Sequence, residues 1–179
     1  MANKKDIYLY FVEGETEYKI VEALKNKYLI SGKIRTHNVV TKKIQSGHLS
    51  TIKRGTTVIF IFDADIDDNI TILEKNIDFL SQSTVVKNLI LIPQINNLED
   101  EIIYATKIKN IEELLDSDST REFKGDMLKC TNTLNKLEEK LFDIEKFWSR
   151  NPTNKFEAYK NNSSQIKIIP SKKNTIPKK

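Results

Sequence analysis

The stretch TVIFIFDADIDD, residues 57–68, decides the fold of this chain. It opens with an uninterrupted β-branched and aromatic run at 58–62. Such a run, followed by a polar bend, is typical of a buried parallel strand. Residues just past the carboxyl end of a strand of this kind line the crevice where α/β proteins bind ligands. We therefore expect a functional site directly after Phe62.

Four carboxylates follow this strand within six positions: Asp63, Asp65, Asp67 and Asp68. At an effective dielectric of about 20, two like charges ~4 Å apart repel by roughly 4 kcal/mol. A divalent cation such as Mg²⁺ relieves this repulsion, and it prefers carboxylate and water oxygens as ligands. A structural role is also open, in which Asp67 and Asp68 begin the next helix and Asp63 holds a turn.

A second acidic turn follows the apolar run at 6–12. Its sequence is EGETE, residues 13–17. Gly14 permits a tight turn, and Thr16 is a predicted N-cap for a helix that continues to about Tyr28. Glu13 thus occupies the same position after its strand as Asp63 does after the later one. A single glutamate at this point is also common in an ordinary exposed turn.

The chain alternates between predicted strands and predicted helices. Apolar runs at 35–41 and 87–93 predict two more strands, and apolar residues three or four apart at 70–80 predict a helix. This alternation favours an α/β fold, with a parallel sheet flanked by helices. The acidic segments after residues 12, 62 and 93, the last of which contains Glu99, should then meet at one edge of the sheet. We expect them to form a single site.

The remainder of the chain differs in character. Residues 106–150 are expected to form a helical extension of the unit at 1–105. Apolar residues recur there every three or four positions and predict an amphipathic helix of about five turns, which packs on the sheet or offers a surface to a partner or a second copy: Leu134, Leu137, Leu141, Ile144 and Trp148. The polar and basic segment 151–179 is expected to be largely disordered.

Composition narrows the class of protein. The chain has 179 residues and a net charge of +4, and part of that charge lies in the C-terminal lysines. Bulk charge therefore does not establish a nucleic-acid partner. The single cysteine excludes an intramolecular disulfide. Because no apolar run approaches the ~20 residues of a membrane span or forms a signal peptide, we expect a cytoplasmic protein without a membrane partner.

Two of these motifs together resemble the Toprim domain. FVEGETE at 11–17 resembles the family's glutamate in a glycine-bearing turn, and IFDAD at 61–65 resembles its D-x-D after a later strand; the two are about fifty residues apart. The first motif is most similar to those of OLD-family and RloB-like phage-defence nucleases. The turn containing Gly47 corresponds loosely to a further glycine-bearing turn. The resemblance covers roughly residues 5–105 and implies a Toprim-like, Rossmann-like sheet.

The resemblance also implies an activity. Asp63 and Asp65 would hold Mg²⁺ or Mn²⁺, with Glu13 as a ligand or general acid/base, and the enzyme would hydrolyse phosphodiester bonds in DNA or RNA. Glu17, Asp67 and Glu99 would be candidates for a further metal. The implied role is that of an effector in phage defence, by abortive infection. Because the chain carries no ATPase region, such a module would come from a partner protein.

Two other functions compete with this interpretation. Phosphatases of the haloacid dehalogenase type also use a D-x-D after a strand, but on their first strand rather than the third, and receiver domains likewise carry their acidic pair on the first strand. The other alternative is a sensor or partner subunit that binds nucleic acid or a nucleotide without cutting it. Three converging carboxylates favour chemistry, because no fold requires them.

Overall fold

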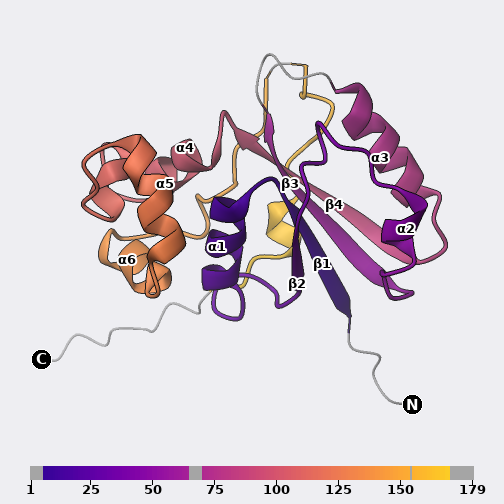
Figure 1. Ribbon diagram of the computed structural model, residues 1–179, viewed down its shortest axis with the longest axis horizontal. Helices are drawn as coiled ribbons and strands as arrows, with labels where there is room; N and C mark the ends of the chain where they lie inside the picture. The colour runs from indigo at the N-terminus through magenta and orange to yellow at the C-terminus, as the bar shows by residue number, and fades with distance from the viewer. Residues whose placement is uncertain (1–5, 65–69, 154, 170–179) are drawn as a thin grey trace, which may run out of the picture.

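The computed structural model describes residues 6–64, 70–153 and 155–169, and its centre is a four-stranded sheet (Figure 1). All strand pairs are parallel, and the strand order is β2-β1-β3-β4. The strands are β1 (Ile7–Val12), β2 (Lys33–Thr36), β3 (Thr56–Ala64) and β4 (Val86–Ile95). The predicted α/β fold with a parallel sheet is confirmed. Its assignment to the Toprim family stays a prediction.

Helices cover both faces of this sheet. Figure 1 shows α1, α4, α5 and α6 on one side of the molecule, and α2 and α3 on the other. The helices are α1 (Glu15–Leu24), α2 (Ser46–Leu49), α3 (Thr71–Ser81), α4 (Leu98–Ala105), α5 (Thr120–Lys129) and α6 (Thr133–Glu139), with 3₁₀ turns η1 (Ile111–Leu114) and η2 (Ser163–Gln165). Within the described ranges, none of these helices has the length and apolar character needed to cross a membrane.

Strand β3 contributes side chains to two separate cores, because alternate side chains of a strand point to opposite faces of the sheet. Ile59 and Ile61 pack with α1 and the C-terminal helices, whereas Phe60 and Phe62 pack with α3. Eight of its nine residues are buried, in agreement with the continuous apolar run. Burial on both faces is the normal state of a parallel strand between helical layers.

The predicted five-turn helix in the extension is wrong. Helix α6 ends at Glu139, and Leu141 has a positive φ of 59° and is 67% exposed. The backbone there turns toward the end of α4: Lys107 N donates to Lys140 O, and Asp143 N donates to Ala105 O. These bonds replace the helical ones, although Leu137, Ile144 and Trp148 are still buried as the spacing suggested.

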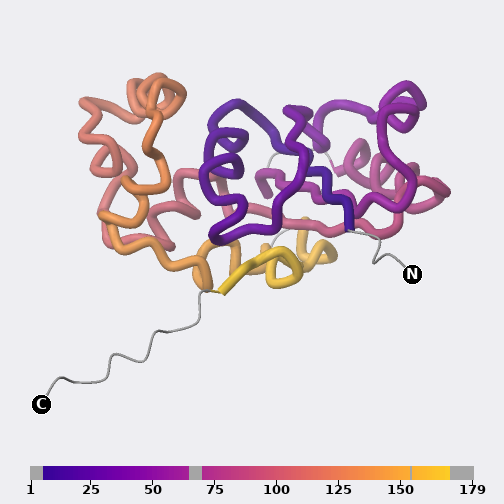
Figure 2. The backbone as a smooth tube through the Cα atoms, turned by 90° about the horizontal axis from the view of Figure 1, so that it is seen from below, coloured from indigo at the N-terminus to yellow at the C-terminus, as the bar shows by residue number. Residues whose placement is uncertain are grey.

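The expectation of a largely disordered segment at 151–179 does not hold for residues 155–169. Figure 2 shows this stretch lying against the body of the molecule. Phe156 and Ile166 are fully buried, in the core beside α3 and in the core beside α1 respectively. Backbone hydrogen bonds join Asn162 N to Leu91 O and Ile30 N to Ile166 O. Composition misled here, because a few apolar residues in a polar segment are enough to dock it.

Candidate functional site

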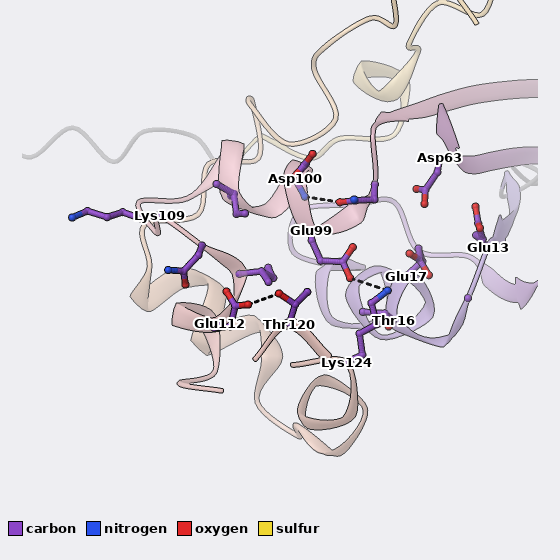
Figure 3. Close-up of a pocket in the computed structure, with 15 residues that line it drawn as sticks. Glu13, Thr16, Glu17, Asp63, Glu99, Asp100, Lys109, Glu112, Thr120 and Lys124 are labelled. Carbon is purple, nitrogen blue, oxygen red and sulfur yellow. Dashed lines mark hydrogen bonds and ion pairs between the residues drawn. The ribbon is translucent and has the colours of Figure 1, made fainter. Parts of the chain in front are cut away.

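A pocket of about 650 Å³ lies at the carboxyl edge of the sheet (Figure 3). The ends of β1 and β3 and the first turns of α1 and α4 form one wall, and η1 and α5 form the other. It is lined by Glu13, Gly14, Thr16, Glu17, Asp63, Asn97, Glu99, Asp100, Ile103, Lys109, Asn110, Ile111, Glu112, Thr120 and Lys124. The acidic segments therefore converge where the sequence predicted.

The position of Asp63 follows from the register of the sheet. It is the penultimate residue of β3, and its paired residue on β4 is Gln94. Gln94 Nε2 donates a hydrogen bond of 2.7 Å to Asp63 Oδ1. Asp63 lies on the same face of β3 as Ile61, which belongs to the core beneath α1. The strand thus directs this carboxylate toward α1 and α4, where the pocket is.

Glu13 comes from the turn between β1 and α1, and Glu17 from the first turn of α1. Gly14 is the N-cap residue of α1, and its carbonyl accepts a hydrogen bond of 3.1 Å from Tyr18 N. A Cβ atom at Gly14 would lie 3.0 Å from Glu17 Oε2. The glycine therefore lets the Glu17 side chain fold back against the turn and face the pocket, rather than extend into solvent.

The four carboxylates influence one another. Figure 3 shows Glu13, Glu17 and Asp63 gathered at the sheet edge, with Glu99 reaching toward them from α4. Burial, together with the charges of Glu13, Glu17 and Glu99, raises the pKa of Asp63 to about 8 against the lowering effect of the Gln94 hydrogen bond. Burial also raises the pKa of Glu17. Either protonation of these carboxylates or a bound cation would therefore relieve their repulsion at this edge of the sheet.

Lys124 is one of the pocket residues that the sequence did not identify. Its Nζ lies 3.4 Å from Glu99 Oε1, and its charge also lowers the pKa of Glu17. Lys124 is on α5, more than 100 residues after Glu17 in the chain. The segment that carries it has no motif, so only the packing of α5 against α1 could bring it to the pocket.

The acidic side chains of the pocket offer carboxylate oxygens, which are the ligands that a hard divalent cation such as Mg²⁺ prefers. Gln94 donates a hydrogen bond to Asp63 Oδ1, and the pKa of Asp63 is raised first by burial and then by negative neighbours, whose charge a cation would offset. Across residues 6–64, 70–153 and 155–169, however, no three His, Cys, Asp or Glu side chains form a ready-made metal-binding group. Asp65 and Asp67 lie outside the described residues, so their predicted part in the site stays a prediction.

Gly47 does not belong to this pocket. It lies in α2, whose neighbours are on the side of the sheet opposite α4 and α5. The loose correspondence with a family turn therefore finds no support from proximity to the carboxylates.

Comparison with known proteins identifies no relative: no family model, characterised protein or solved structure matches this chain.

Proposed function

We propose that this protein is a metal-dependent nuclease that hydrolyses phosphodiester bonds in DNA or RNA. The observation that carries the proposal is the convergence of Glu13 and Asp63 at the carboxyl edge of parallel strands, where burial and like charges raise the pKa of Asp63 to about 8. Parallel sheets bind ligands at this edge. A strongly perturbed carboxylate in a cleft is typical of functional sites, and a cation bound beside it would offset the repulsion.

The charged residues of the pocket have different roles in this proposal. Glu13 and Asp63 hold Mg²⁺ or Mn²⁺, with Asp65 and Asp67 as further ligands on the strength of the D-x-D resemblance. When bound, the cation would activate a water molecule and offset the charge on a phosphodiester. Lys124 pairs with Glu99 and also lowers the pKa of Glu17, so it offsets part of the negative charge at the outer side of the pocket.

A cleavage assay tests the proposal. Purified protein is offered plasmid, single-stranded DNA and total RNA, each with Mg²⁺, Mn²⁺ or EDTA. We expect cutting that requires the cation and that falls at least about 100-fold in Glu13→Gln and in Asp63→Asn, because each variant removes one proposed ligand charge. Asp78→Asn is the matched control, since Asp78 is an exposed carboxylate on α3 outside the pocket.

Equal cutting by Asp63→Asn and the wild-type protein would contradict the proposed site. Cutting that persists in EDTA would contradict the cation requirement. Loss of cutting in Asp78→Asn as well would show that the assay follows folding rather than chemistry.

One observation favours a second candidate, a protein that binds a nucleotide without cutting a chain. The volume of the pocket, about 650 Å³, matches that of sites that hold a single small ligand. In that case, nucleotides with Mg²⁺ would raise the melting temperature of the wild-type protein and not that of Asp63→Asn, while no polymer would be cut.

Two further elements of the proposal rest on the sequence resemblance alone. They are a role as the effector of a phage-defence system and activation by an ATPase or another partner protein. The phosphatase alternative has less support, because Asp63 lies at the end of β3, the third strand along the chain.

A further inference from the structure

Gln94 is a fully buried polar side chain on β4. Along β4 it follows Ile90 and Ile92, which point to the same face and belong to the core beside α1. Burying an amide among apolar groups is costly unless its polar atoms are hydrogen-bonded. An apolar residue would fill this place without that cost, so the amide calls for an explanation.

The hydrogen bonds of Gln94 point to Asp63. Its Nε2 donates to Asp63 Oδ1 at 2.7 Å, whereas its Oε1 is buried and has no hydrogen-bond partner among the residues that the structure describes. The two residues are paired across β3 and β4, so both side chains leave neighbouring strands at the same level. Within the described part of the chain the amide is thus only half satisfied, and the satisfied half acts on a carboxylate that lines the pocket.

This arrangement constrains the Asp63 carboxyl group. With Oδ1 held by Gln94, the group cannot rotate freely, and among the described residues no hydrogen bond engages Oδ2, which we take to face the ligand. In metal sites, hydrogen-bond partners of this kind orient the ligating carboxylates, and their removal weakens metal binding by about 10–100-fold. Mg²⁺ also keeps several of its water molecules when it binds to proteins. Such a water molecule could donate a hydrogen bond to a nearby buried acceptor.

We propose that Gln94 is a positioning residue of the cation site: its Nε2 fixes the Asp63 carboxylate, and its Oε1 accepts a hydrogen bond from a water molecule of the bound cation. The inference rests on the proposed function, because it takes Asp63 to be a cation ligand. It adds a residue from β4 to a site otherwise drawn from β1 and β3.

The test is a calorimetric titration of the metal-free, full-length protein with Mn²⁺, without any substrate. We expect Gln94→Met to weaken Mn²⁺ binding by about 10-fold and Asp63→Asn by about 100-fold or more. Gln94→Asn, a second variant that keeps the amide but shortens its reach, should resemble Gln94→Met. Asn76→Ala is the control, because Asn76 is a buried amide that bonds only backbone groups in the core beside α3; it should bind Mn²⁺ as the wild type does. Thermal melts establish that each variant is folded at the temperature of the titration.

The outcomes separate the two proposals. If both Gln94 variants bind Mn²⁺ like the wild type while Asp63→Asn does not bind it, the role of Gln94 is overturned and the proposed cation site stands. If Asp63→Asn binds Mn²⁺ as the wild type does, or if the wild type does not bind Mn²⁺, both are overturned. If Asn76→Ala weakens binding as much as Gln94→Met, the effect is one of general stability and the positioning role is overturned.

Discussion

The environment of Asp63 in the folded protein favours its protonated form. An aspartate in an unfolded chain has a pKa of about 3.9, whereas burial and neighbouring carboxylates raise the pKa of Asp63 to about 8 in the fold. Between these values the folded protein binds more protons than the unfolded chain does. The contribution of Asp63 to the stability of the fold is therefore fully present below about pH 4 and is lost as the pH rises through about 8.

A direct prediction follows for the metal-free protein. In EDTA, we expect the Asp63 contribution to the free energy of unfolding to decline between about pH 4 and pH 8. Asp63→Asn should remove this part of the decline and be about 1–3 kcal/mol more stable than the wild-type protein at pH 7.5, because Asn is neutral without the proton that Asp63 must take up on folding. Urea titrations followed by circular dichroism at several pH values measure both quantities. A variant less stable than the wild type at pH 7.5 would show that Asp63 is not under repulsion.

Glu101 is a second buried carboxylate, but its environment is matched to its charge. It is fully buried and accepts hydrogen bonds from Ile95 N at 2.9 Å and Trp148 N at 3.2 Å. Arg150 Nη2 pairs with it at 3.0 Å and also lies over the ring of Tyr104. This one side chain joins the end of β4 to the chain that follows α6.

We expect Glu101→Ala to lower the free energy of unfolding by about 3–5 kcal/mol, because it leaves buried donors and the Arg150 charge without their acceptor. Urea denaturation measures the loss. Asp6→Ala, which breaks the exposed pair between Asp6 and Lys87, is the comparison and should change stability little. Similar losses of unfolding free energy in the two variants would contradict the expectation that the buried interactions of Glu101 contribute more than the exposed pair does.

At the scale of elements, local sequence patterns were sufficient to predict an element whose structure depends on its own residues alone. The continuous apolar run predicted β3, and strand position predicted that Glu13 and Asp63 would meet at one edge. Patterns failed where distant backbone groups intervened, as at Leu141, whose neighbours bond to residues 105–107 instead of continuing a helix. Lys124 could not be predicted for a similar reason: its place in the pocket depends on how α5 packs, and sequence spacing does not encode that.

The end of α6 gives a prediction that separates the observed turn from the expected helix. Leu141 has a φ of 59° and is 67% exposed, so its side chain gains little from packing while its backbone is strained. We expect Leu141→Gly to raise the free energy of unfolding by about 0.5–1 kcal/mol. Leu128→Gly is the matched control: Leu128 is a half-exposed leucine inside α5, and its replacement should cost about 1 kcal/mol. Destabilisation by both, measured in urea, would favour a helix at Leu141.

At the scale of the whole molecule, the C-terminal stretch at 155–169 connects the two cores that the sheet separates. Phe156 packs beside Phe62 in one core, with ring centroids 6.0 Å apart, and Ile166 is buried in the other. Between them, Asn162 N donates to Leu91 O on β4. The sheet is thus enclosed by a segment that begins about 90 residues after Asp63, and we expect the stability of the proposed site to depend on it.

A pair of shortened chains tests this dependence. A chain ending at Ile169 keeps every contact described above and serves as the reference, whereas a chain ending at Thr153 loses both anchors. Removing one large buried apolar side chain costs about 2–5 kcal/mol, and a domain has only about 5–15 kcal/mol to lose. We therefore expect the chain ending at Thr153 to have no cooperative urea transition at 25 °C, and Phe156→Ala and Ile166→Ala to lower the free energy of unfolding by about 2–5 kcal/mol each. Because the two residues lie in different cores, their losses should add in the double variant to within about 0.5 kcal/mol. An unchanged urea midpoint in the chain ending at Thr153 would mean that the segment rests on the surface and that the sheet is stable without it.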